Sequence, residues 1–144
     1  MKKYLFSVLI ALSFGLTACA HDQIITVEQL SQPAQTLIST HFADDPVSYV
    51  MQDREGFSLE YEVRLASGTK VDFDSKGELK KVDCDLRPVP EALIPESVRA
   101  YVQKMFPNAF ITEWGKDDRR WKAELNNGLD LEFNNQYQFI RVDD

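Results

Sequence analysis

Histidine and cysteine, the side chains that most often supply a catalytic base, a nucleophile or a zinc ligand, are scarce in this chain of 144 residues. The two histidines are His21 and His41, and neither Cys84 nor any serine has an evident histidine partner. No His, Cys and carboxylate residues have the close spacing of a zinc site, and there is no glycine-rich phosphate loop. The sequence therefore predicts a protein that is not an enzyme.

Acidic residues between positions 72 and 83 have the spacing of a calcium loop. Hard oxygen ligands around a turn glycine, here Gly77, are what Ca²⁺ requires. However, Lys76 stands where a further ligand is expected, and both flanks have a strand pattern, so a simple hairpin turn is the alternative. Calcium is the single cofactor that the sequence suggests. The candidate ligands are Asp72, Asp74, Glu78 and Asp83.

Charged residues also alternate with apolar ones along several segments, which gives each segment one wet side and one dry side. The wet side is either an ordinary solvated face or an acidic docking surface. On a docking surface, charge would steer a protein partner and aromatic side chains would anchor it. The residues that the sequence nominates for partner binding are Glu60, Glu62, Arg64, Asp72, Trp114, Glu124, Asp130 and Glu132.

Two helices and two sets of strands would position these faces. Apolar residues recur at helical spacing over residues 30–42 and 94–106, and Ser31 is expected to cap the first helix. By the same alternation, Phe57 falls on the dry side of the strand predicted at residues 57–65. The predicted strands lie near residues 47–52, 57–65, 70–74 and 78–83 after the first helix, and near 110–115, 121–125, 129–133 and 137–142 after the second.

The two halves of the chain match one another residue by residue. An offset of 64 pairs Phe42 with Phe106, and further on an offset of 60 pairs Phe73 with Phe133. The change of offset places four extra residues in the first half, near residues 53–56. Such a match predicts a tandem duplication. The expected fold is α+β, with two repeats that each pack one helix on an antiparallel sheet of about four strands.

The first twenty residues have the character of a signal peptide. Lys2 and Lys3 precede an uncharged run of about 13 residues, whereas a membrane-spanning helix needs about 20. Cleavage after Ala20 would release a soluble chain, and a lipobox ending at Cys19 would instead leave a lipid anchor; both routes fit. The predicted layout is a signal peptide at 1–20, repeats at 24–86 and 91–144, and a proline-containing linker at 87–90.

The charge balance narrows the class of partner. The chain has 16 basic and 23 acidic residues, and loss of Lys2 and Lys3 with the signal peptide would change the net charge from −7 to −9. An acidic surface repels phosphate backbones, which argues against nucleic acid as a partner. Cys84 would have no intramolecular partner, so it is either a small buried hydrophobe or the site of an intermolecular disulfide.

Short motifs at the end of the predicted signal peptide and along nearly all of the predicted mature chain resemble the PepSY-like family of small periplasmic proteins, also known as beta-lactamase-inhibitor-like, from Bacteroidetes-type bacteria. Taken singly the motifs are weak, but their order and spacing are specific. They are Ala18-Cys19-Ala20, Tyr61-Glu62-Val63, residues 68–74, Gly77, Val82-Asp83-Cys84, residues 89–95, Tyr101-Val102, residues 106–109 and Asn127-Gly128-Leu129.

The resemblance implies tandem helix-plus-sheet units whose sheets form a curved binding surface. It also implies a role in the periplasm or cell envelope as a binding protein for a protein partner, or as an inhibitor of a periplasmic or secreted hydrolase. No segment after the first twenty residues is apolar enough to be a transmembrane segment. A calcium- or small-ligand-responsive sensor is the alternative, because the acidic turn near Asp72 suggests an ion site.

Overall fold

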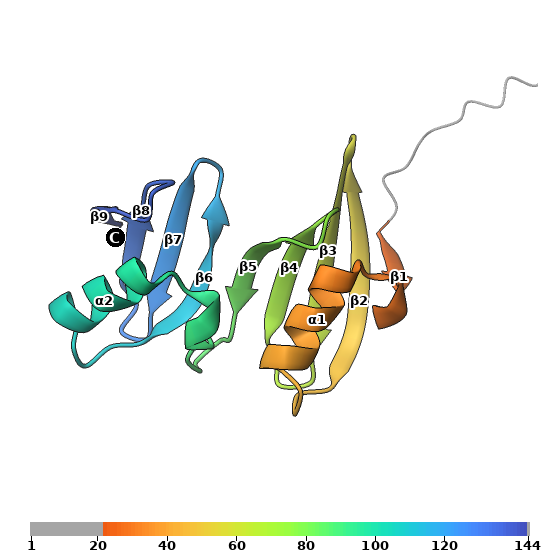
Figure 1. Cartoon of the computed structure of the whole chain (residues 1–144), viewed down its shortest axis with the longest axis horizontal. Coiled ribbons are helices and arrows are strands. Elements are labelled where there is room, and N and C mark those ends of the chain that lie inside the picture. Colours follow the sequence, from red (N-terminus) through yellow and green to blue (C-terminus); the bar gives the residue numbers. More distant parts are fainter. Residues whose placement is uncertain (1–21, 144) are drawn as a thin grey trace, which may run out of the picture.

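The computed structural model describes residues 22–143 and shows an α+β chain in which nine strands form one antiparallel sheet. Two α-helices lie on the same face of this sheet (Figure 1). The strands follow one another along the sheet in sequence order. The predicted signal peptide, both of its processing routes and Cys19 lie outside the described residues. Within these residues, no helix has the length and apolar character needed to cross a membrane.

The elements follow the predicted segments closely, with two short 3₁₀ helices, η1 and η2, and one strand, β1, in addition. The elements are β1 (Gln23–Ile25), η1 (Val27–Gln29), α1 (Gln32–His41), β2 (Val47–Glu55), β3 (Ser58–Leu65), β4 (Lys70–Asp74), β5 (Leu79–Asp83), η2 (Glu91–Leu93), α2 (Glu96–Met105), β6 (Ile111–Asp117), β7 (Arg120–Leu125), β8 (Asp130–Phe133) and β9 (Phe139–Asp143).

Each helix packs an apolar stripe onto the sheet. Ala34 and Ile38 of α1 and Val98 and Val102 of α2 are buried at helical spacing, as the pattern predicts. Ser31 holds the N-cap position of α1, but its hydroxyl donates to the Lys76 carbonyl, 3.1 Å away, in the turn after β4. The cap residue therefore ties α1 to the sheet.

The strands alternate between the core and solvent, which produces the dry face beneath the helices. Phe73 in β4 and Phe133 in β8 are both fully buried there. Burial of a side chain of this size stabilises the fold by about 1.5–3 kcal/mol. The other fully buried apolar strand residues include Val63, Leu65, Val71, Val82, Ala123, Leu125 and Leu131.

Irregularities of the sheet recur at the offsets found in the sequence. The register of β2 against β3 shifts between Val47 and Tyr49, and that of β6 against β7 shifts between Ile111 and Glu113, 64 residues later. A second pair of shifts, in β4–β5 and β8–β9, lies 60 residues apart. Strands β2 and β3 contain 9 and 8 residues, whereas β6 and β7 contain 7 and 6. The four extra residues of the first half therefore lie in the β2–β3 hairpin.

One continuous sheet runs through both halves of the chain, a point that the sequence left open. Strands β5 and β6 pair antiparallel and join the halves edge to edge. The linker at 87–90 is fixed to this joint, because the Val89 N–H donates to the Ile111 carbonyl at 2.8 Å. Strand β1 was not predicted, and it adds a fifth strand beside β2.

Candidate binding surface

The face of the sheet opposite the helices, called the outer face below, carries most of the residues nominated for partner binding. It holds the charged residues that alternate with the core in each strand. Seven of the eight nominated residues lie on it: Glu60, Glu62, Arg64, Asp72, Glu124, Asp130 and Glu132.

Trp114 does not belong to this surface, so its prediction as a partner anchor is wrong. Its side chain is 2% exposed and lies in the core, where it stacks on Trp121 with 5.0 Å between ring centroids. The register shift after Ile111 explains the error. A bulge changes the phase of the alternation, so Ile111 and Trp114 are both buried although they are three residues apart.

Over strands β3 and β4 the charges of the outer face are paired. Glu62 accepts from Arg64 at 3.1 Å and from Lys70 at 3.3 Å, and Lys70 also lies 3.6 Å from Asp72. Glu60 pairs with Lys80. Burial raises the pKa of Asp72, with Lys70 opposing this shift and Glu62 adding to it. This part of the surface is a ladder of compensated charges.

Over strands β5 to β9 the outer face instead presents carboxylates side by side. Each member of this set lies directly opposite the next across neighbouring strands, and we call the set the acidic row. Because facing carboxylates repel one another, such a row is unfavourable unless cations compensate it. The acidic row consists of Asp83, Glu113, Glu124, Asp130 and Asp143.

Cations compensate only part of the acidic row. Lys81 lies 2.8 Å from Glu113, Lys122 lies 2.5 Å from Asp130, and Arg141 lies 3.4 Å from Asp143. Within the described part of the chain, neither Asp83 nor Glu124 has an ion pair. Glu124 at the centre of the row and Asp83 at one end therefore keep negative charge that a cationic group from outside would neutralise.

The pKa of Glu124 reflects this crowding. Burial raises the pKa, and the neighbouring charges of Glu113, Asp130 and Asp83 raise it further, while Lys122 opposes them. Proximity of like charges disfavours the ionised form of a carboxylic acid. A basic group placed beside Glu124 would therefore favour its ionised form.

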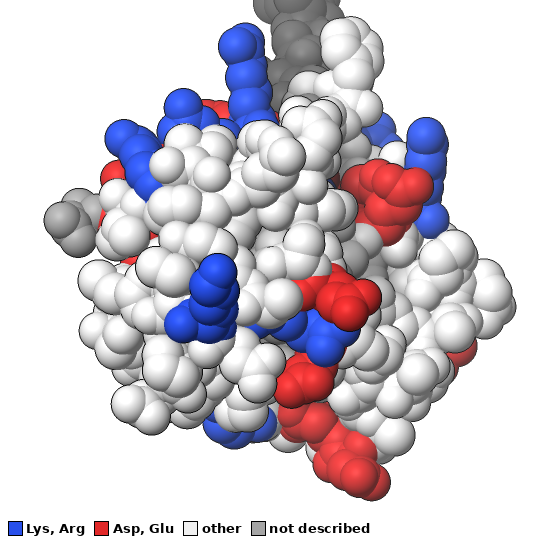
Figure 2. Space-filling view, turned by 60° about the vertical axis from the view of Figure 1, so that its left-hand side comes forward, with Lys and Arg blue, Asp and Glu red and all other residues white. Residues whose placement is uncertain are grey.

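Glu132 lies on the same face but is already satisfied. Arg141 donates to its two carboxylate oxygens at 2.9 and 3.1 Å, and Arg120 pairs with it as well. Hydrogen bonds from Arg141 and then Arg120 lower its pKa to about 2. Figure 2 brings the C-terminal half forward. It shows acidic and basic side chains next to one another near the middle of the view, with broad uncharged areas on either side.

The four predicted calcium ligands do not converge. Asp74 accepts the backbone N–H groups of Lys76 at 2.8 Å and Glu78 at 2.9 Å, so its carboxylate closes the β4–β5 turn. Asp83, at the other end of that hairpin, accepts the N–H of Asp85 at 2.9 Å. Over residues 22–143 no group of three or more His, Cys, Asp or Glu side chains is arranged to hold a metal ion.

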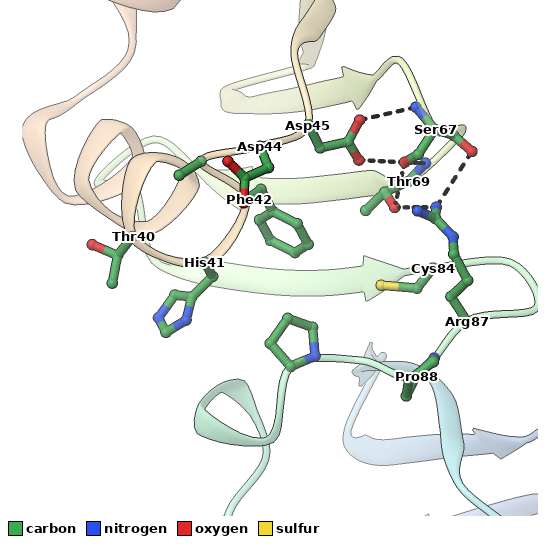
Figure 3. Close-up of a pocket in the computed structure, with 12 residues that line it drawn as sticks. Thr40, His41, Phe42, Asp44, Asp45, Ser67, Thr69, Cys84, Arg87 and Pro88 are labelled. Atoms are coloured by element: carbon green, nitrogen blue, oxygen red, sulfur yellow. Dashed lines mark hydrogen bonds between the residues drawn. The ribbon is translucent and has the colours of Figure 1, made fainter.

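A pocket of about 630 Å³ lies between the end of α1 and the linker (Figure 3). Arg87 fixes one wall, since its Nη2 donates to Thr69 Oγ1 at 2.8 Å and to the Ser67 carbonyl at 3.3 Å. The Ser67 N–H in turn donates to the Asp45 carboxylate at 3.0 Å. This volume is in the range of small-molecule sites, so the pocket is a second candidate binding site.

Cys84 lines this pocket and is 3% exposed. Burial raises the pKa of its thiol, although a hydrogen bond with Thr69 opposes the shift. A thiol that is held protonated is a weak nucleophile. Cys84 therefore has the environment of a small buried hydrophobe, the first of the two interpretations that the sequence allowed.

Phe57 is placed differently from its prediction. The alternation puts it on the dry side of β3, but it lies just before that strand and is fully exposed at the end of the β2–β3 hairpin. The hairpin extends past the end of α1, so the helix does not cover its tip (Figure 1). An exposed aromatic side chain of this kind is a typical anchor for a partner, and the sequence pattern did not reveal it.

The acidic row was also only partly visible in the sequence. The sequence predicts Glu124 and Asp130 as partner-binding residues and Asp83 as a calcium ligand, but it gives no such role to Glu113 or Asp143. Their only signal is the period-two pattern of β6 and β9. The row depends on the pairing of β5 with β6, which a single sequence does not specify.

These features define a class of small α+β proteins in which helices cover one face of a single sheet and the other face is charged. The family described as "Putative beta-lactamase-inhibitor-like, PepSY-like" matches residues 59–141. The chain belongs to this PepSY-like family. No curated protein matches the chain.

Solved structures from Bacteroides are similar over nearly their whole length. A "putative calcium-regulated periplasmic protein" from Bacteroides thetaiotaomicron has 33% identity and a TM-score of 0.81, covering 85% of this chain and 97% of its own. A "putative periplasmic protein from DUF2874 family" from Bacteroides vulgatus has 33% identity and a TM-score of 0.82, covering 90% and 100%. A further Bacteroides vulgatus protein, of unknown function, has 27% identity and a TM-score of 0.81, covering 86% and 100%.

Proposed function

We propose that this chain is an exported, non-catalytic binding protein that docks a basic protein partner on the outer face of its sheet. The acidic row is the observation that supports this most. Asp83 and Glu124 lie in the row without an ion pair among the described residues, and like charges raise the pKa of Glu124. Surface charge that is not compensated within a protein steers and orients an oppositely charged partner.

The proposed location is the periplasm or the cell envelope. The three similar Bacteroides proteins are all described as periplasmic, and residues 1–20 have the pattern of a signal peptide. Processing at Cys19 would give a lipoprotein, and cleavage after Ala20 a soluble chain. Mass spectrometry of the mature protein from the producing cells distinguishes these, because lipidation adds mass to Cys19.

A periplasmic or secreted hydrolase is the first class of partner to test. The family description, beta-lactamase-inhibitor-like, supports that choice. Phe57 would be the apolar anchor of the contact, since it is fully exposed at the hairpin tip. An inhibitor of this kind blocks its target by occupying the surface around the active site and needs no catalytic groups of its own.

The division of the chain into repeats at 24–86 and 91–144, with a linker at 87–90, belongs to the same proposal. The register shifts that recur 64 and 60 residues apart support it. So does the order of one α-helix followed by four strands, which occurs twice. A duplication would explain why the backbone plan is shared while the side chains of the outer face differ.

Affinity capture from an envelope extract with two variants of equal charge tests the docking surface. The test variant is Glu124→Lys with Asp130→Lys, in the acidic row. The control variant is Glu91→Lys with Glu96→Lys, on η2 and α2, away from the outer face. We expect a partner that the natural chain and the control retain and that the row variant loses.

Two results would count against the proposal. A partner lost equally from both variants would respond to net charge and not to the acidic row. A partner retained by both would bind elsewhere, and Phe57→Ser would then show whether the hairpin tip is its site. Equal melting temperatures of all variants are required, so that loss of folding does not imitate loss of binding.

A calcium-responsive sensor is the second candidate. It is favoured by the 33% identical protein described as calcium-regulated. Because residues 22–143 contain no group of three or more side chains arranged to hold a metal ion, the cation would have to draw carboxylates of the acidic row together, relieving their repulsion. A cation that binds the folded chain raises its melting temperature. We expect a larger rise with millimolar CaCl₂ than with MgCl₂, lost in Glu124→Gln; an equal response to both salts would leave only charge screening.

A further inference from the structure

The two edges of the nine-stranded sheet differ in how well they are protected. β1, at one edge, has only three residues, and a very short edge strand discourages pairing with other chains. β9, at the other edge, has five residues and no proline, and its charged side chains are Arg141 and Asp143. Ile140 and Val142 of β9 are 42% and 39% exposed. An uncovered strand of this kind is a template for a further strand.

Strand β5 shows what such an edge accepts. Residues 81–83 of β5 and 141–143 of β9 have the same order of a basic residue, valine and aspartate, 60 residues apart. In β5 this edge is covered by β6, which runs antiparallel to it. Lys81 forms an ion pair with Glu113 across the joint, at 2.8 Å. In the described part of the chain nothing pairs with the equivalent edge of β9.

The backbone of β9 is oriented for the same kind of pairing. Cys84 donates its N–H to the Thr112 carbonyl at 2.9 Å, so by alternation the backbone groups of Val82 also face β6. β9 pairs with β8 in the register in which β5 pairs with β4. The N–H and C=O groups of Val142 therefore point to the open edge.

We propose that β9 pairs antiparallel with β9 of a second copy of this chain, about a twofold axis at Val142. In this register the two Val142 residues exchange backbone hydrogen bonds. Arg141 of each copy lies opposite Asp143 of the other, which places opposite charges in contact. The axis is perpendicular to the sheet, so the helices of both copies remain on one side. This inference does not depend on the proposed function.

The open edge favours a second copy as its occupant because the strand is complementary to itself. Only a register centred on Val142 brings Arg141 and Asp143 together twice. Twofold closure also uses both β9 edges, whereas pairing of β9 with β1 of another copy would continue into an open-ended filament. The contact is small, so the dimer is expected to dissociate on dilution.

Sedimentation equilibrium of the chain without residues 1–20 tests the dimer, over a range from about 1 µM to about 500 µM, where a small interface becomes populated. We expect the mass to rise from one chain to two. Arg141→Asp and Asp143→Arg should each weaken self-association about tenfold, because like charges then face each other. An equimolar mixture of the two variants should regain it, since aspartates then face arginines.

Val142→Pro provides an independent variant, because proline removes the N–H at the centre of the contact. We expect this variant to remain a monomer with an almost unchanged melting temperature. A mass of one chain at every concentration, an open-ended series of masses, or a mixture that fails to associate better than its components would each overturn the dimer. If Arg141→Asp is unstable because it loses Glu132, Asp143→Arg and Val142→Pro still decide the question.

Discussion

The N-terminal half, from α1 to β5, and the C-terminal half, from α2 to β9, share a backbone plan but fill it with different side chains. Both halves have a register shift in their first and last strand pairs. Both also turn with a positive φ at equivalent positions, Gly77 at 83° and Tyr137 at 59°. The backbone plan therefore does not dictate one set of side chains.

The cores show the difference most clearly. In the C-terminal half Trp114 stacks on Trp121, and Tyr101 stacks on Phe139 with 4.5 Å between centroids. Phe133 contacts three of these rings edge-on. The aromatic pairs found among the described residues all lie in this half. In the N-terminal half Tyr61 lies opposite Phe73 across β3 and β4, and the other buried neighbours on these strands are aliphatic. This half also has an extra strand, β1, at its edge.

The largest expected effect is the loss of either matched core phenylalanine. Phe73→Ala and Phe133→Ala should each lower the free energy of unfolding by about 3–5 kcal/mol, the usual cost of such a cavity. Phe133→Ala should cost about 0.5–1.5 kcal/mol more, because it also loses its aromatic contacts. Urea unfolding measures both. Equal losses would show that the aromatic cluster adds nothing beyond burial.

A second comparison concerns two turns with a glycine at positive φ, Gly77 in the N-terminal half and Gly128 in the C-terminal half. A Cβ at Gly77 would lie 2.0 Å from Ser31 Oγ and 3.0 Å from the Ala34 nitrogen, where α1 meets the turn. Gly77→Ala should therefore destabilise the chain by about 2–3 kcal/mol, from the left-handed backbone and the clash together.

Gly128→Ala is the control for that variant. Its φ of 84° is similar, but a Cβ there would meet nothing within 4 Å. Only the backbone cost of about 1–2 kcal/mol then applies. Thermal melts that show equal losses for the two alanine variants would contradict the close packing of α1 against the β4–β5 turn.

The elements of this fold are readable from the sequence because each obeys a local rule. Helical spacing predicted α1 and α2, and alternation predicted β3, β4, β7 and β8. The strands β2, β5, β6 and β9 were expected on either side of these hairpins. β1 escaped because Gln23–Ile25 is too short to show a period. Trp114 was misplaced because the bulge after Ile111 changes the phase of β6, and a bulge has no reliable sequence mark.

The candidate site is less predictable because it is built from contacts between distant segments. The acidic row requires β5 to pair with β6 in one register, across the linker. Phe57 has the sequence context of a core residue, and its exposure follows only from the length of the β2–β3 hairpin relative to α1. Local patterns specify which side of a strand is wet, but not which wet residues become neighbours.

On the outer face, the pKa values of two carboxylates at matched positions, Asp72 and Glu132, shift in opposite directions. Arg141 and Arg120 lower the pKa of Glu132 to about 2 from 4.5, so its ionised form stabilises the folded chain above pH 4.5. That contribution is lost as the pH falls from 4.5 to 2. Burial raises the pKa of Asp72 above 3.8. At a pH above this raised pKa, the ionised carboxylate therefore destabilises the folded chain. This penalty disappears as the pH falls towards 3.8.

The pH dependence of unfolding should separate these two carboxylates. Glu132→Gln should reduce the loss of stability between pH 4.5 and 2, and Asp72→Asn should raise stability at pH 7 relative to pH 4. Chemical denaturation across that range is the measurement. If both variants changed the pH profile in the same direction, the two positions would not differ in the way that their partners indicate.

The smallest effect is expected in the acidic row itself. Glu124→Gln removes the carboxylate that its neighbours repel, so the melting temperature at low salt should rise slightly, and the gain should fade as salt screens the row. Glu62→Gln, in the paired half of the outer face, should instead lower the melting temperature, because Arg64 and Lys70 lose their common partner. Opposite signs for two glutamates on one face follow from their neighbours alone. A gain in both variants would mean that net charge governs this surface and that the distinction between its paired and unpaired regions has no energetic basis.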